Sequence, residues 1–182
     1  IVVVLHPSAK RANAWPVAHF KALLGEMMRV PGIGVLITGA EGDRQMHREL
    51  EAAGPGRIAS VAGLPLPAVS ALLERADLFV GADTGPMHLL NGTATRSVLL
   101  FGPTKPARFA PFGERHRIIE AGWCCDEKLH DVCRLDPQAA HGRCMASIGV
   151  KRVFEAVSDA VTEIEHERGH AGVAVIAATA SP

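Results

Sequence analysis

The sequence has no excess of either charge and no long apolar run. Its 182 residues include 19 Lys and Arg against 19 Asp and Glu. No basic run and no aromatic–basic alternation indicates nucleic-acid binding. No apolar stretch approaches the roughly 20 residues that span a bilayer, and the pattern of a signal peptide is absent. We therefore expect no nucleic-acid partner and no transmembrane segment.

Cysteine is scarce, and it is confined to one short segment that holds Cys124, Cys125, Cys133 and Cys144. This is not the dispersed disulfide framework of a small secreted protein. His130 and His141 lie in the same segment, so a zinc site is one interpretation. Adjacent Cys124 and Cys125 fit a tetrahedral site poorly, and we expect no stoichiometric zinc. Reduced, buried thiols are the first interpretation, with a structural metal and a disulfide as alternatives.

The remaining composition is that of an ordinary globular domain, with 48% apolar and 21% charged residues. Apolar runs typical of strands alternate with segments of helical period, which predicts an α/β fold with a doubly wound parallel sheet. The strands are expected at 1–5, 35–38, 57–61, 78–81, 97–101 and 117–120, and the longest helix at 149–168. Residues 1–168 are predicted to form a single domain. The apolar tail 169–182 is expected to be disordered or to form a contact surface.

The most informative stretch runs from Ala76 to Gly113. A short apolar strand leads directly to Asp83, and Thr84-Gly85-Pro86 then begins a helix. Thr84 has the chemistry of an N-cap, and proline is tolerated in a first helical turn. In an open α/β sheet this turn lies at the carboxyl end of a strand, where ligands bind. The N–H groups at such a helix start suit a phosphate.

Three acidic or basic side chains near the strand ends are candidate ligand contacts. Asp83 follows a buried strand, where desolvation of a carboxylate is costly. It either bonds the hydroxyls of a ligand or the amides of its own turn. His88 lies four residues beyond Thr84 and therefore on the same helix side, although such a histidine is often a core residue. Glu41 follows the second strand and could accept from both ribose hydroxyls, or it is a surface residue near a helix start.

Two spaced motifs in this stretch resemble the signature of glycosyltransferase family 9, the bacterial heptosyltransferase-like enzymes. They are D-T-G-P-M-H at 83–88 and L-L-F-G-P-T-x-P-x-R-F-x-P-F-G at 99–113. In that family both belong to the C-terminal, nucleotide-sugar-binding half of a two-domain GT-B enzyme. The resemblance thus implies a Rossmann-like domain without its N-terminal partner. Ile1 already lies in a strand-like run, and we expect the sequence to be part of a larger protein.

The resemblance also implies which residues bind the donor. These are Ser8, Lys10, Glu41, Asp83, Thr84, Gly85, Pro86 and His88. Thr84 and Gly85 would face the diphosphate. The family usually has a phosphate-binding lysine two residues before Trp15, and Asn13 stands there in this sequence. Lys10 or Arg11 could supply the missing charge, although a loop cation is often only solvated.

The function implied is inverting transfer of a heptose-like sugar from an ADP-heptose-like donor to a lipopolysaccharide-type acceptor. The general base would belong to the missing N-terminal domain, so no catalytic residue is assigned here and the chain alone is expected to be inactive. No D-x-D motif is present, and neither a metal nor another cofactor is expected. The enzyme would be cytoplasmic, or peripheral at the inner membrane face. A non-catalytic nucleotide-binding module and a GT-B type nucleotide-sugar epimerase are the alternatives.

Overall fold

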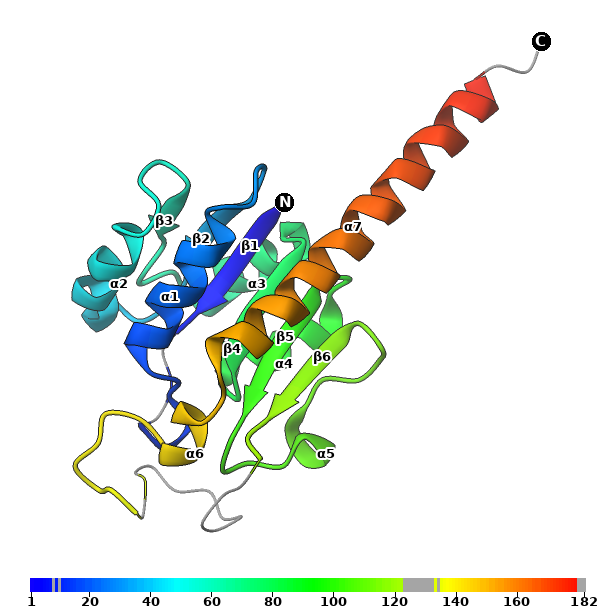
Figure 1. The fold of residues 1–182 in the computed structure, drawn as a ribbon. Coiled ribbons are helices and arrows are strands. Elements are labelled where there is room, and N and C mark those ends of the chain that lie inside the picture. The colour runs from blue at the N-terminus through cyan, green and yellow to red at the C-terminus, as the bar shows by residue number, and fades with distance from the viewer. Residues whose placement is uncertain (8, 10, 123–132, 134, 180–182) are drawn as a thin grey trace.

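A computed structural model of the protein describes residues 1–7, 9, 11–122, 133 and 135–179 (Figure 1). Within this part of the chain, six strands form one sheet in the order β3-β2-β1-β4-β5-β6, and all neighbouring strands are parallel. The strands are β1 (Val2–His6), β2 (Gly34–Ile37), β3 (Ile58–Ser60), β4 (Leu78–Ala82), β5 (Arg96–Phe101) and β6 (His116–Glu120). The predicted doubly wound, Rossmann-like α/β fold is confirmed.

The helices alternate with these strands along the chain. The α-helices are α1 (Val17–Met27), α2 (Arg44–Glu51), α3 (Leu66–Arg75), α4 (Gly85–Leu89), α5 (Pro106–Phe109), α6 (Arg143–Ala146) and α7 (Val150–Thr179). Short 3₁₀ turns are η1 (Arg11–Asn13), η2 (Glu41–Asp43) and η3 (Leu90–Gly92). The main departure from expectation is α7, which continues to Thr179 instead of ending at residue 168. Glycines at 169 and 172 lower helix propensity without blocking the backbone hydrogen bonds.

The sheet is buried on both faces because its central strands are continuous apolar runs. On one face Val3 and Leu5 pack with the apolar sides of α1, α2 and α7. On the other face Val4 and Phe79 pack with α3 and α4. The alternation of neighbouring residues between the two clusters is the period of two expected for a strand. No helix in the described part of the chain is long and apolar enough to cross a membrane.

The C-terminal helix α7 is tied to the start of the chain. Its residues Val153, Val157, Val161 and Ile164 are buried in the first of the two clusters. Just before α7, the carbonyl of Ile148 accepts a hydrogen bond of 2.9 Å from the buried indole of Trp15. This bond fixes the loop that leads from β1 into α1.

The loop after β1 is also held by a backbone contact with the segment before α6. Gly142 lies so close to Ala12 that an added Cβ would overlap the Ala12 carbonyl oxygen. Only a residue without a side chain permits this approach. The η1 turn, which carries Asn13, is therefore in close backbone contact with Gly142, a residue far away in the sequence.

Replacing Gly142 by Ala should lower the free energy of unfolding by about 1–3 kcal/mol, because backbone atoms must move to admit the methyl group. The matched control is Gly25→Ala in α1, where an added Cβ meets nothing within 4 Å. That change should stabilise the protein by about 0.5–1 kcal/mol. Urea unfolding of both variants measures these changes in the free energy of unfolding. Equal changes of the same sign would contradict the close contact between Gly142 and Ala12.

Candidate functional site

The candidate site lies where β1 and β4 end, side by side. The chain leaves β1 in one direction to build β2 and β3, and then returns to build β4 and β5 on the other side. His6 pairs in register with Gly81, so the two loops begin next to each other. The two loops then diverge, and in open α/β sheets ligands bind in the crevice at such a switch point.

Asp83 follows the last residue of β4, and its side chain is 8% exposed. The partner found for it in the described part of the chain is His88 of α4, whose Nε2 lies 3.8 Å from Oδ1. No hydrogen bond to the carboxylate is found among the described residues. A carboxylate this buried normally accepts hydrogen bonds. The Asp83 carboxylate oxygens can therefore still accept hydrogen bonds from a ligand, and the half-exposed His88 lies next to them.

Thr84 takes the N-cap position of α4 with extended backbone angles, as predicted. The predicted capping bond is wrong, because no side-chain cap forms and the Thr84 hydroxyl donates instead to the Ala82 carbonyl at 3.3 Å. Gly85 and Pro86 open the helix, and an added Cβ on Gly85 would meet nothing within 4 Å. The start of α4 is thus left uncapped by its own turn and accessible to a ligand.

Asn13 connects the loop after β1 to the loop after β4. It is 6% exposed, and its Nδ2 donates to the backbone carbonyl of Asp83 at 3.3 Å. Its Oδ1 is buried and finds no hydrogen-bond partner among the described residues. Thr104, which follows β5 at the same edge, is 5% exposed, and its hydroxyl likewise has no partner in the part of the chain that the structure describes. The sequence around Asn13 does not reveal that it joins the two loops, because its hydrogen-bond partner lies 70 residues away.

His6 and Thr38 join the ends of β1 and β2. The His6 Nδ1 lies 3.0 Å from the Thr38 Oγ1, and both residues are buried. Burial lowers the pKa of His6 to about 4, and it outweighs the neighbouring carboxylate of Asp43, which acts in the opposite direction. His6 is therefore neutral at neutral pH, and it acts as a hydrogen-bonding group of the crevice without adding charge.

Glu41 lies in η2, after β2, and its carboxylate faces Arg44. The guanidinium donates to both carboxylate oxygens, with a distance of 3.0 Å from Nη2 to Oε2. These hydrogen bonds, together with the positive charge of Arg44, lower the pKa of Glu41, although partial desolvation opposes them. Asp43, which directly precedes α2, accepts a hydrogen bond from the Ala40 N–H and makes no side-chain cap on α2.

The structure thus places most of the predicted site residues on one edge of the sheet. Asp83, Thr84, Gly85, Pro86 and His88 follow β4 directly. Glu41 lies two strands away, and no hydrogen bond or ion pair joins it to Asp83 in the described part of the chain. Ser8 and Lys10 lie outside the described residues, so their predicted contacts stay predictions.

The sequence profile of Glycosyltransferase family 9 (heptosyltransferase) matches residues 1–139. The chain belongs to glycosyltransferase family 9. It is 31% identical over 80 residues to lipooligosaccharide heptosyltransferase 2 of Campylobacter jejuni, a match that covers 43% of this chain and 24% of that protein. It is 26% identical over 120 residues to lipopolysaccharide heptosyltransferase 1 of Escherichia coli K12, with 65% and 37% covered.

Solved structures show the same fold. The E. coli ADP-heptose lps heptosyltransferase II superimposes with a TM-score of 0.73 at 22% identity, over 90% of this chain and 47% of that one. The E. coli heptosyltransferase WaaC with ADP gives a TM-score of 0.69 at 19% identity, over 87% and 44%. The chain therefore spans less than half the length of these family 9 relatives.

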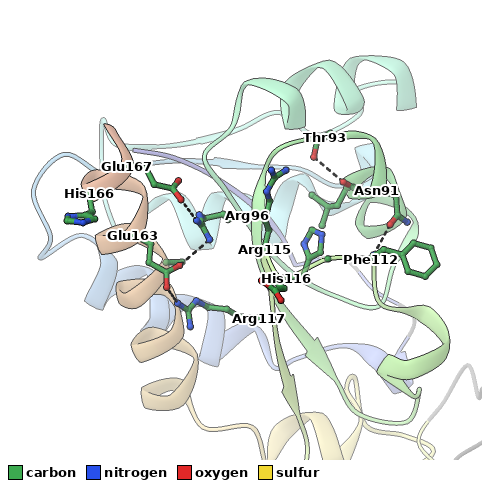
Figure 2. Close-up of a pocket in the computed structure, with 14 residues that line it drawn as sticks. Asn91, Thr93, Arg96, Phe112, Arg115, His116, Arg117, Glu163, His166 and Glu167 are labelled. Atoms are coloured by element: carbon green, nitrogen blue, oxygen red, sulfur yellow. Dashed lines mark hydrogen bonds and ion pairs between the residues drawn. The ribbon is translucent and has the colours of Figure 1, made fainter. Parts of the chain in front are cut away.

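A larger cavity lies at the opposite edge of the sheet of this family 9 chain, where β5 and β6 begin (Figure 2). It has a volume of about 920 Å³. Four of its charged groups bond one another: Arg96 contacts Glu163 and Glu167 of α7, and Arg117 contacts Glu163 at 2.6 Å. This ion-pair network holds α7 against the sheet, and the matched charges make the cavity a weaker candidate than the crevice at Asp83.

Two of the four cysteines fall within the described residues. Cys133 and Cys144 are both buried. Burial alone would raise the pKa of Cys133, but backbone hydrogen bonds from Arg143, Leu135 and Asp136 lower it. No group of three metal-ligating side chains occurs among the described residues. Cys124 and Cys125 lie outside them, so the expectation about zinc stays a prediction.

The low pKa of His6 predicts a pH-dependent stability. An unfolded histidine has a pKa near 6.5, so between pH 6.5 and 4 the unfolded state binds the proton and the folded state does not. Folding stability contributed by neutral His6 is therefore complete above pH 6.5 and is lost as the pH falls to about 4. The shift corresponds to about 3 kcal/mol.

Urea unfolding of the wild-type chain and of His6→Gln, at several pH values in this window, measures the effect. The difference in unfolding free energy between the two proteins should shrink as the pH falls, because only the wild type must protonate a buried imidazole. Parallel curves for the two proteins would show that His6 does not titrate as its burial requires.

Proposed function

We propose that this chain is the donor-binding half of a heptosyltransferase-like glycosyltransferase, and that it binds a nucleoside diphosphate sugar such as ADP-heptose between the loops after β1, β2 and β4. The observation that carries the proposal is the buried Asp83 carboxylate at the crevice, which has accepting capacity left for ligand hydroxyls. Family membership supports it. So do structural neighbours that hold ADP and ADP-2-deoxy-2-fluoro heptose.

The positions of the strands agree with the dimensions of such a ligand. Glu41 and Asp83 follow β2 and β4, which are separated by β1. Two strand spacings amount to roughly 10 Å, a distance that a ribose and a diphosphate can span. In this arrangement the ribose hydroxyls bond Glu41, the diphosphate lies at the backbone of Thr84 and Gly85, and Asp83 with His88 faces the sugar side.

The reaction that we propose breaks the bond between the anomeric carbon and the diphosphate oxygen. An acceptor hydroxyl of a lipopolysaccharide-type molecule attacks the opposite face of that carbon, so the configuration inverts. A base from the other half of the protein takes the hydroxyl proton. The diphosphate leaves with the bonding electron pair, and backbone N–H groups at the start of α4 stabilise its growing charge.

Replacing Asp83 by Ala should weaken ADP-heptose binding, followed by the same titration, about tenfold, because a charge-assisted hydrogen bond to the sugar hydroxyls is lost. The wild-type chain should bind ADP in the high-micromolar to millimolar range. Amide shifts during titration with ADP, GDP and UDP give the affinities and should map to residues 6–7, 39–42 and 83–88. Asp159→Ala, an exposed carboxylate on α7, is the control.

Thermal midpoints of both variants complete that test. If Asp83→Ala loses stability in proportion to binding, the carboxylate only supports its own turn. Shifts outside the three segments would place the nucleotide elsewhere.

The 182-residue chain alone should transfer no sugar, because the base and the acceptor site belong to the other half. General-base help is worth about 10²–10⁴-fold, and proximity of the two substrates adds more. The assay mixes the chain with ADP-heptose and a truncated lipopolysaccharide acceptor, and the longer protein is the positive control. Transfer at a hundredth of the control rate would place the base within these residues.

The same assay separates the alternatives. A longer protein that binds ADP-heptose but never transfers would be a binding module. One that converts the nucleotide sugar without an acceptor would be an epimerase.

A further inference from the structure

Asn13 reaches the turn after β4 from a different loop. Its Nδ2 donates to the backbone carbonyl of Asp83 at 3.3 Å, and this bond distinguishes the amide nitrogen from the amide oxygen. A trans peptide is planar, so its carbonyl and its N–H point in opposite directions. The Thr84 N–H belongs to the same peptide as the Asp83 carbonyl. By holding that carbonyl, Asn13 therefore also sets the direction of the Thr84 N–H.

The Thr84 N–H is left for a ligand. No hydrogen bond from this group is found among the residues that the structure describes. The Thr84 carbonyl, in contrast, accepts from the Met87 N–H at 3.1 Å in the first turn of α4. The peptide between Asp83 and Thr84 is thus held by Asn13 on one side and by α4 on the other, and its N–H faces away from Asn13.

Asn13 is itself fixed by residues that come much later in the sequence. Gly142 lies directly against the carbonyl of Ala12, the residue before Asn13. Trp15, two residues after Asn13, donates to the carbonyl of Ile148. The η1 turn therefore cannot shift without moving the segment around α6. Asn13 is also 6% exposed, so its side chain is surrounded by protein.

An amide at this position has a cost that folding does not require. Its Oδ1 is buried and finds no hydrogen-bond partner in the described part of the chain. A buried acceptor without a hydrogen bond destabilises the folded state. An apolar side chain of similar shape would fill the position without this unbonded oxygen. The amide is therefore explained better by its bond to the turn after β4 than by stability.

We propose that Asn13 is a positioning residue of the nucleotide site, which aims the Thr84 N–H at the diphosphate by holding the peptide between Asp83 and Thr84. The proposal rests on the nucleotide-binding function proposed above. Unlike the lysine that is usual in family 9 at this position, Asn13 contributes no charge. It acts on the ligand only through the backbone that it holds.

Two substitutions separate the donated hydrogen bond from shape and from charge. Asn13→Leu keeps the approximate shape and removes the donor. Asn13→Asp keeps the shape more closely, and its carboxyl can donate to the Asp83 carbonyl only when it is protonated. Burial raises the pKa of the introduced carboxyl, so this group should gain its proton as the pH falls from 8 to 5.

The affinity for ADP is measured by titration of the 182-residue chain at both pH values and is expressed relative to the wild type. Asn13→Leu should bind ADP about fivefold more weakly at either pH, because one hydrogen bond is lost. Asn13→Asp should bind more weakly still at pH 8, where its charge repels the diphosphate. At pH 5 it should bind more tightly than Asn13→Leu, since relief of repulsion alone would only make the two equal.

Asn91 provides the matched control. Its Nδ2 also donates to a backbone carbonyl, that of His88 at 3.4 Å, but at the other end of α4. Asn91→Leu should bind ADP like the wild type. Urea unfolding of all the variants at both pH values gives their stability, which a purely structural role would change in proportion to affinity.

Three results would overturn the role of Asn13. They are an Asn13→Leu variant that binds ADP like the wild type, an Asn13→Asp variant that is no tighter than Asn13→Leu at pH 5, and losses of affinity that follow losses of stability. A wild type that does not bind ADP would instead overturn the proposed function itself.

Discussion

The crevice is organised around the Asp83 carboxylate, which lies at the end of a fully buried strand with its side chain 8% exposed. A carboxylate in this position normally forms several hydrogen bonds within the protein. Asp83 has instead a half-exposed histidine at 3.8 Å and, through its backbone carbonyl, the amide of Asn13. The strand, the uncapped start of α4 and the loop after β1 are arranged around a carboxylate that accepts no hydrogen bond from the residues that the structure describes.

The two edges of the sheet differ in how their polar groups are matched. At the amino edge a large cavity is lined by arginines and glutamates that neutralise one another. At the carboxyl edge, Asn13 and Thr104 have buried oxygen atoms that make no hydrogen bond to any described residue. The cavity of about 920 Å³ therefore lies away from the crevice. The buried oxygen atoms of Asn13 and Thr104 lie beside the crevice. Because this chain spans less than half the length of its relatives, buried polar atoms without hydrogen bonds indicate the binding site better than cavity volume does.

Local pattern predicted the elements of this fold, and long-range contact decided the details of its site. Continuous apolar runs such as 78–82 identify buried parallel strands, and a residue directly after such a run, like Asp83, must lie at the ligand edge. The Thr84 hydroxyl was misassigned because its competing acceptor, two residues earlier, is equally local. The hydrogen bond from Asn13 to the Asp83 carbonyl could not be predicted, since only the sheet brings these two residues together.

The hydrogen bond between Trp15 and Ile148 joins residues that are 133 positions apart. During synthesis from the N-terminus, the Trp15 indole cannot form this hydrogen bond until Ile148, near the end of the domain, has been made. The loop that borders the crevice on the β1 side therefore reaches its final position only after Ile148 has left the ribosome. Contacts of such high sequence separation slow folding, and here they make the binding edge one of the last parts of the domain to form.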